Sequence, residues 1–278
     1  DAGAGQIDLI IEQSGKALIR VIDDGIGMTE NDAAMAFEKH ATSKIETIDD
    51  LFSVQTKGFR GEALASIAAI AQVELKTRQE PHEIGTEVHV AGSEVQSTQP
   101  CACPSGTSIA VKNLFFNVPA RRQFLKSDSV ERKHILDEFT RIVLAHPEIG
   151  FSLVHNGNCL YQLKEGNYRQ RVIAVLGDNM NDRIIPIQEE TEYVKIEGFI
   201  GKPEFVRKTR GHQFLFANRR FFKSNSLSHA VYSAYRDMIP SGRFPFFVVY
   251  LTVDPHRMDI NVHPTKQEIK FSDEKLVY

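Results

Sequence analysis

The stretch from Thr56 to Ala71, which reads TKGFRGEALASIAAIA, combines residues that could hold a phosphate group. Gly58 and Gly61 can adopt backbone angles that other residues avoid, so this loop can fold closely over a ligand. From Glu62 onward the sequence favours a helix, whose first turn carries unpaired N–H groups and the positive end of the helix dipole. A phosphate is a natural ligand there. An ordinary glycine loop before a buried helix explains the same residues equally well.

A carboxylate and two glycines follow a predicted strand near the start of the chain. Residues 6–11 and 17–22 are predicted to form two strands joined by a turn, and the second strand runs into DDGIGM at Asp23. The Asp23 side chain can accept a hydrogen bond from an amino group, while Gly25 and Gly27 let a flat ring approach the backbone. Adenine recognition requires both features. A hairpin turn that contains Asp and Gly accounts for the motif as well.

Two hydroxyls and an ammonium occur together in the sequence HATSK, which follows a helix that Thr29 is predicted to cap. Thr42, Ser43 and Lys44 suit a phosphate or a metal-bound phosphate, although a cation is also favoured at the end of any helix. The chain contains neither the P-loop pattern G-x-x-x-x-G-K-[ST] nor the dinucleotide pattern G-x-G-x-x-G. A P-loop nucleotide site is therefore excluded.

Basic side chains cluster in two segments of the chain. We predict that both clusters form a groove that holds DNA by its phosphates without reading base sequence. A charged face that only contacts water is the commoner role of such segments. One cluster is Arg121, Arg122 and Lys126, and the other, interrupted by the single acid Glu204, is Lys202, Arg207, Lys208, Arg210, Arg219, Arg220 and Lys223.

Length and composition bound the class of protein. A chain of 278 residues is comfortable for two domains, and its net charge of −3 means that any surface for nucleic acid must be local. Cys101, Cys103 and Cys159 do not complete a zinc site, so we interpret them as reduced thiols in a reducing compartment. No apolar run approaches the roughly 20 residues that span a bilayer. The chain begins without Met or a signal peptide, which suggests a piece of a longer protein.

Alternating and helical patterns organise the rest of the chain. Helices are predicted at 129–145 and 226–238, and residues 113–126 are predicted to be a loop. The polar run at 176–182 indicates a boundary between a domain at 1–178 and a second domain at 179–278. Strands are predicted at 72–77, 86–90, 94–98, 108–111, 151–154, 159–163, 193–200, 212–217, 246–253, 260–262 and 268–271.

Seven motifs occur in the order that is typical of MutL-type DNA mismatch repair proteins, and the chain resembles the bacterial members of this family over essentially its whole length. The family shares its ATP-binding fold with DNA gyrase, a chaperone family and sensor histidine kinases. The resemblance therefore implies an α+β fold: a two-layer α/β sandwich of that type, followed by a smaller α/β transducer domain of the ribosomal protein S5 type. The motifs are DAGA at Asp1, DDGIGM at Asp23, HATSK at His40, GFRGEALASI at Gly58, GT at Gly106, NVPARRQFL at Asn117 and DINVHPTKQEIKF at Asp259.

The resemblance assigns roles by position. Asp23 matches the aspartate that binds the adenine amine, Gly25 and Gly27 lie beside the base, and Thr107 matches a hydroxyl near the same site. Lys266 matches a lysine of the second domain that reaches the γ-phosphate and can sense its presence. The segment along the nucleotide is Thr42, Ser43 and Lys44, and the lid whose amides hold the phosphates is Gly58, Phe59, Arg60, Gly61, Glu62, Ala63 and Leu64.

The resemblance also implies cofactors and partners, and this chain departs from the family's pattern in two respects. The implied cofactors are ATP and Mg²⁺, and the implied partners are DNA, the mismatch-recognition protein MutS and a second copy in the parent protein, in the bacterial cytoplasm at the nucleoid. The family's general-base glutamate, magnesium-binding asparagine and dimerisation arm precede DAGA, so we expect this chain by itself to bind nucleotide weakly without turning it over. Where the family has N-G-R, this chain has Asn218-Arg219-Arg220, which puts that turn in doubt.

Two classes of function stay open on the sequence. The first is a repair module, switched by ATP, that binds DNA and couples mismatch recognition to strand removal. The second is the ATP-binding subunit of a type II topoisomerase or a chaperone, although a gyrase-like chain is expected to carry a Q-T-K type motif where this chain has NVHPTK. A non-catalytic interaction module is a third interpretation.

Overall fold

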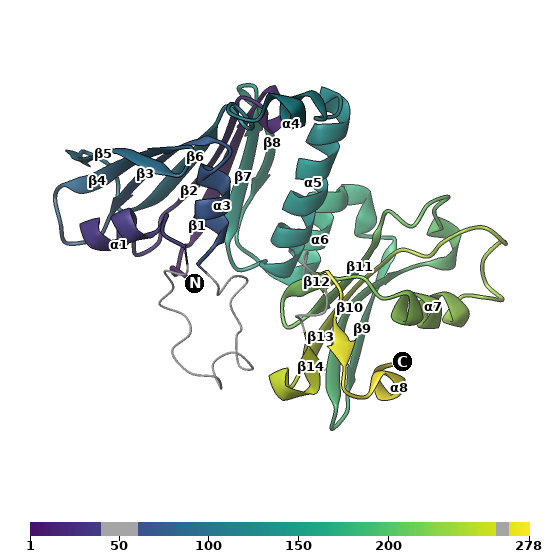
Figure 1. Cartoon of the computed structure of the whole chain (residues 1–278). Coiled ribbons are helices and arrows are strands. Elements are labelled where there is room, and N and C mark those ends of the chain that lie inside the picture. The colour runs from purple at the N-terminus through teal and green to yellow at the C-terminus, as the bar shows by residue number, and fades with distance from the viewer. Residues whose placement is uncertain (40–60, 260–266) are drawn as a thin grey trace. The chain divides into compact units, whose positions relative to one another are not determined.

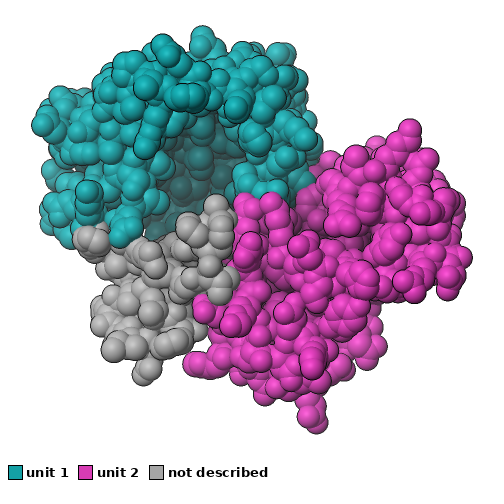
Figure 2. All heavy atoms as spheres, turned by 45° about the vertical axis from the view of Figure 1, so that its right-hand side comes forward, with its two compact units in different colours: residues 1–46, 58–143, 147–166 teal, residues 47–57, 144–146, 167–278 magenta. Residues whose placement is uncertain are grey.

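The computed structural model describes residues 1–39, 61–259 and 267–278. These residues form two compact units, which Figure 2 draws in different colours. Of the described residues, the first unit holds 1–39, 61–143 and 147–166, and the second holds 144–146, 167–259 and 267–278. The main division falls between Gly166 and Asn167, and a domain boundary at residue 178 stays a prediction. No described helix has both the length and the apolar character needed to span a membrane.

The first unit is built on an eight-stranded sheet with the order β5-β4-β3-β6-β2-β1-β7-β8 (Figure 1). Every neighbouring pair is antiparallel except β1 with β7. Strand β6 lies between β3 and β2, so the order of the strands in the sheet differs from their order along the chain. The strands are β1 (Gln6–Glu12), β2 (Leu18–Asp23), β3 (Gln72–Arg78), β4 (Gly85–Ala91), β5 (Glu94–Cys101), β6 (Gly106–Lys112), β7 (Gly150–His155) and β8 (Asn158–Leu163).

Helices α1, α3 and α5 lie against one face of this sheet (Figure 1). Alternate residues of a strand point to the same face, so Val73 and Leu75 of β3 and Val88 of β4 are buried in one aliphatic core with residues of α1 and α3. Phe139 of α5 meets Phe151 of β7 edge to face, with ring centroids 6.3 Å apart. The helices of this unit are α1 (Glu30–Met35), α3 (Ala63–Ala68), α4 (Pro119–Gln123) and α5 (Asp128–Ala145).

Two of these helices test local predictions from the sequence. The cap of α1 is confirmed, because the Thr29 hydroxyl accepts a hydrogen bond from the backbone N–H of Asp32 at 3.1 Å. The prediction of a loop at 113–126 is wrong in part, because this segment contains the short helix α4. Pro119 opens α4 in its first turn, where the N–H that proline lacks has no helical partner in any case.

The loop before α4 is tied to the end of α3. The last carbonyl groups of a helix lack partners within the helix. Here the carbonyl oxygen of Ala69 accepts a hydrogen bond from Asn117 Nδ2 at 2.9 Å, and that of Ile70 accepts one from the backbone N–H of Phe115 at 2.7 Å. Two hydrogen bonds therefore link the segment that leads into α4 to the C-terminal end of α3, the helix that follows the glycine loop.

The second unit contains a five-stranded sheet with the order β12-β11-β13-β10-β9 and a two-stranded sheet of β14 and β15. Strand β13 is central, and every residue in it except Thr252 is buried. Helix α6 and strands β9 and β12 are not predicted from the sequence pattern. The elements are α6 (Tyr168–Leu176), β9 (Ile184–Glu190), β10 (Val194–Gly201), β11 (Gln213–Ala217), β12 (Arg220–Phe222), α7 (Asn225–Ala234), β13 (Phe247–Val253), β14 (Met258–Asp259), β15 (Lys270–Phe271) and α8 (Glu274–Val277).

The turn between β11 and β12 keeps a left-handed backbone although it contains no glycine. Asn218 has a φ of 46° and Arg219 a φ of 64°, which is typical of two-residue hairpin turns that match strand twist. Asn218 also bonds to β13, because its Nδ2 donates to Val253 O at 2.7 Å and its Oδ1 accepts from Val253 N at 2.9 Å. The order Asn-Arg-Arg therefore preserves the turn, with strain at Arg219.

Replacing Arg219 by glycine is expected to raise the free energy of unfolding by about 1 kcal/mol, because glycine adopts this φ without steric cost. Chemical denaturation of the variant and the wild type measures the difference. Lys223→Gly is the control at an exposed position without positive φ, and it should lower stability. A lower midpoint for Arg219→Gly than for the wild type would show that the side-chain contacts of Arg219 outweigh the backbone strain.

Candidate functional site

Asp23 lies at the end of β2, in a row of three side chains that crosses adjacent strands. Asp23 pairs with Thr107 of β6, and Thr107 pairs with Thr77 of β3. Directly paired residues present their side chains on the same face of a sheet. The Oγ1 atoms of Thr77 and Thr107 are 3.1 Å apart. The row brings a carboxylate and two hydroxyls together at one end of the sheet.

One oxygen of the Asp23 carboxylate is held by the protein. Its Oδ1 accepts a hydrogen bond from Gly25 N at 2.9 Å, whereas Oδ2 has no hydrogen bond to any of the residues that the structure describes. The next carboxylate, on Asp24, has a structural role: its Oδ1 accepts from the backbone N–H groups of Gly5 and Gln6 at 2.8 and 2.9 Å. Asp24 thus ties this turn to the start of β1, whereas Asp23 presents its second oxygen in the row with the two hydroxyls.

The loop after Asp23 is packed tightly on the end of β3. Gly27 has a φ of +69°, and a Cβ at this position would lie 2.1 Å from the carbonyl oxygen of Arg78. The backbone N–H of Met28 donates to Thr77 Oγ1 at 2.9 Å. Gly25 is similarly close to Ala2, since a Cβ there would lie 2.8 Å from its backbone oxygen. Backbone packing explains both glycines, and their contact with a base stays a prediction.

Thr77 is a residue of this site that the sequence pattern did not reveal. Its side chain is buried, and its hydroxyl donates to Gly106 O at 3.0 Å while it accepts from Met28 N. Thr77 and Thr107 are 30 residues apart in the chain. Only the pairing of β3 with β6 brings them together, so no local signal marks Thr77.

Part of the sheet face beside Asp23 is not covered by the helices in the described part of the chain. Val21 lies two residues before Asp23 on β2 and therefore points to the same face, yet it is 41% exposed. Figure 2 shows a hollow in the surface of the first unit. An uncovered apolar side chain next to a carboxylate and two hydroxyls suits a flat ring with polar edges.

Only some of the other predicted nucleotide-binding residues lie in the part of the chain that the structure describes. Gly61 and Glu62 lead into α3, and Ala63 and Leu64 form its first turn. Glu62 occupies the N-cap position, but its side chain makes no capping hydrogen bond. Outside the described residues lie Thr42, Ser43, Lys44, Gly58, Phe59, Arg60 and Lys266.

The predicted DNA contacts belong to both units. The side chains of Arg121 and Arg122 are exposed on α4, and Lys126 is exposed just after it, in the first unit. The other predicted DNA-binding residues lie in the second unit. The prediction that the two clusters form one groove stays a prediction. The exposed members in the second unit are Arg207, Lys208, Arg210, Arg219 and Lys223.

Contacts with Phe244 fix the segment that carries this second cluster. The backbone N–H of Arg207 donates to Phe244 O, and Phe244 N donates to Arg207 O, both at 2.9 Å. The guanidinium of Arg210 lies 4.9 Å from the centroid of the Phe244 ring. Arg220 differs from its neighbours because it is half-buried in β12, and burial lowers the pKa of its guanidinium.

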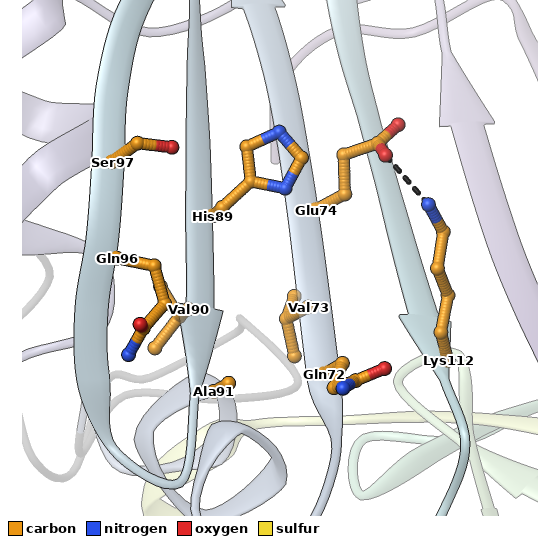
Figure 3. A pocket seen from close by; sticks show the side chains of 9 residues that line it. All are labelled: Gln72, Val73, Glu74, His89, Val90, Ala91, Gln96, Ser97 and Lys112. Atoms are coloured by element: carbon orange, nitrogen blue, oxygen red, sulfur yellow. Dashed lines mark hydrogen bonds and ion pairs between the residues drawn. The ribbon is translucent and has the colours of Figure 1, made fainter.

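A further group of charged side chains surrounds a pocket of about 460 Å³ on the other face of the first sheet (Figure 3). Glu74, Glu87 and His89 place ligand atoms within 4.8 Å of one another, as a metal site would. However, Lys112 Nζ lies 2.6 Å from Glu74 and Lys76 Nζ lies 3.2 Å from Glu87. Burial opposes ionisation of Glu74, yet the bond from Lys112 and nearby cations leave its pKa lowered. Because ammonium groups already neutralise these carboxylates, we assign no metal here.

Comparisons with known proteins agree with this architecture. The family described as "DNA mismatch repair protein, C-terminal domain" matches residues 172–278. The DNA mismatch repair protein MutL of Christiangramia forsetii is 57% identical over 278 residues, which is 100% of this chain and 45% of that protein. The Aquifex aeolicus MutL ATPase domain complexed with ADP is 25% identical, with a TM-score of 0.70 over 92% of this chain and 87% of that one.

A further solved structure, the N-terminal domain of a DNA repair protein, has a TM-score of 0.82 at 23% identity and covers 100% of this chain and 86% of that one, which supports the fold alone. The α+β fold is confirmed, and the matches favour mismatch repair over a topoisomerase or chaperone subunit. The chain spans less than half the length of the curated relatives that it matches. On these similarities, the chain belongs to the MutL family of DNA mismatch repair proteins.

Proposed function

We propose that this chain is the nucleotide-binding part of a mismatch repair protein that is switched by ATP, binds DNA without sequence preference and couples mismatch recognition to strand removal. The row of Asp23, Thr107 and Thr77 supports this function most directly. It joins one open carboxylate oxygen to two hydroxyls beside the exposed side chain of Val21. The ADP in the structure of the Aquifex relative supports the same class of ligand.

In this proposal the Oδ2 atom of Asp23 accepts a hydrogen bond from the exocyclic amine of adenine. The Thr107 hydroxyl orients the base or a water beside it, and the buried Thr77 hydroxyl holds Thr107 in place. The segment 42–44 and the lid 58–64 hold the phosphates, and Lys266 reaches the terminal one. Mg²⁺ would accompany the phosphates and neutralise their charge. The Oδ1 atom of the nearby Asp24 is bound by two backbone N–H groups, and we assign no protein ligand to the ion and no general base to this chain.

The proposed partners are DNA, the mismatch-recognition protein MutS and a second copy of the parent protein, acting in the bacterial cytoplasm at the nucleoid. DNA contact is supported by the exposed cations of each unit. Arginine and lysine side chains that bind phosphates position a protein on DNA without reading its sequence.

Asp23→Asn is expected to weaken ATP binding by about 1–3 kcal/mol, which is about fivefold or more, because a ligand hydrogen bond inside the protein is lost or inverted. Calorimetric titration with ATP and with GTP measures the effect. Since an amide can donate to the carbonyl oxygen of guanine, the preference for ATP over GTP should fall as well.

Glu94→Gln is the matched control for this test. It removes the same charge at an exposed position of β5 and should leave ATP affinity unchanged. If the Asp23→Asn protein binds ATP as tightly as the wild type and keeps its preference over GTP, Asp23 does not contact the base.

A further inference from the structure

An exposed aromatic side chain lies within the basic segment of the first unit. Phe124 follows α4 directly and is 80% exposed, the highest value among the large apolar side chains in the described part of the chain. The exposed cations Arg121, Arg122 and Lys126 lie within three residues of it along the chain. A single exposed apolar residue is common on proteins, so the argument depends on the charges around the ring.

The acidic residues nearby do not neutralise these three cations. Asp128 is paired with Lys16, with 2.7 Å between Nζ and Oδ1. Glu131 accepts a hydrogen bond from the backbone N–H of Lys126 at 2.7 Å. Within residues 1–39, 61–259 and 267–278, no salt bridge to the three cations is formed. This surface therefore offers an aromatic ring together with three positive charges that an anionic ligand could neutralise.

The backbone that carries the ring is held in place. The N–H of Phe124 donates to the carbonyl oxygen of Arg121 at 3.1 Å, and the next residue, Leu125, is half-buried. The preceding loop is bonded to the end of α3 through Asn117 and Phe115. A ring on a fixed support loses little conformational freedom when it binds, which favours a specific contact.

We infer that Arg121, Arg122, Phe124 and Lys126 form a contact site for unpaired nucleotides, in which Phe124 stacks on a base and the cations bind the flanking phosphates. Stacking on an aromatic ring tolerates any sequence, because every base has a π-face. The faces of paired bases are covered by their neighbours in a duplex, so Phe124 should favour single strands. A protein partner could also cover the ring, but three unpaired cations favour a polyanion. The inference rests on the proposed DNA binding and adds a preference for unpaired strands.

The composition of the chain permits a direct optical test of stacking. The chain contains no tryptophan, so Phe124→Trp introduces a single reporter at the site. Its emission should be quenched when an oligothymidylate strand binds, whereas an abasic strand of the same length and charge should leave it nearly unchanged. Equal emission with the two strands at saturation would overturn the stacking contact.

Affinity measurements separate stacking from an apolar contact. Phe124→Ala and Phe124→Leu are both expected to bind oligothymidylate about tenfold more weakly than the wild type, while Phe124→Trp retains affinity. Binding to a duplex of equal length should stay unchanged in all three variants. Val95→Ala, at a 51% exposed position on β5, is the control and should bind both nucleic acids normally. Thermal unfolding of each variant checks that the fold is intact.

Each contrary result has a distinct meaning. Wild-type affinity in Phe124→Leu would show an apolar contact without stacking, and equal losses for strand and duplex would show that the ring does not distinguish them. If Phe124→Ala keeps its DNA affinity but loses self-association in sedimentation experiments, the ring is a protein contact. These results overturn the inference and leave the proposed DNA binding standing. A wild-type chain that binds neither strand nor duplex contradicts both.

Discussion

Gly27→Ala is expected to abolish nucleotide binding and to lower the free energy of unfolding by about 2–4 kcal/mol. Gly27 has a φ of +69°, and a Cβ there would lie 2.1 Å from the carbonyl oxygen of Arg78. The opposing atom belongs to the backbone of β3, so no side chain can rotate to relieve the contact. The loop must instead move away, which breaks the bond from Met28 N to Thr77 Oγ1 and displaces the Asp23 row.

Gly157→Ala separates this steric contact from the cost of a positive φ. Gly157 has a φ of +78° in the turn between β7 and β8, but nothing lies within 4 Å of a Cβ built there. This variant should lose only about 1 kcal/mol of stability and keep its ATP affinity. Denaturant unfolding and calorimetry with ATP measure both quantities. Tight ATP binding by Gly27→Ala would place the nucleotide away from this loop.

Changing Arg207, Lys208 and Arg210 together to glutamine is expected to weaken DNA binding on the order of a hundredfold at low salt. All three side chains are exposed, and their segment is fixed by the backbone pairing of Arg207 with Phe244. Each phosphate contact contributes about 0.9 to the slope of log affinity against log salt concentration. Loss of all three should therefore flatten this slope by up to about 2.7.

A control with the same change in net charge tests whether position matters. Arg236, Lys270 and Lys275 are exposed cations of the same unit that lie outside the predicted cluster. Their replacement by glutamine should change the slope far less than the first triple variant. Equal slopes for the two triple variants would mean that total charge, and not the segment 207–210, governs DNA binding. Because Arg210 stacks on Phe244, thermal unfolding should accompany both measurements.

Elements whose stabilising contacts are close along the chain could be predicted from the amino-acid sequence. Asn156 and Gly157 both have positive φ in the turn between the predicted strands at 151–154 and 159–163, which is what an Asn-Gly pair favours in a hairpin. Thr29 predicts the start of α1 because its hydroxyl bonds a backbone N–H only three residues later. The ordered motifs also pointed to the family, which the similarity to curated relatives confirms.

Tertiary structure alone decided which side chains share the site. Thr77 meets Thr107 because β6 pairs with β3 and not with β5, which precedes it in the chain. The turn at Arg219 stays left-handed without glycine while Asn218 makes two hydrogen bonds to Val253. Sheet order depends on burying whole faces of distant strands, and such distant bonds can hold a strained backbone. Neither the burial of whole sheet faces nor the hydrogen bonds between distant residues can be inferred from a local stretch of sequence.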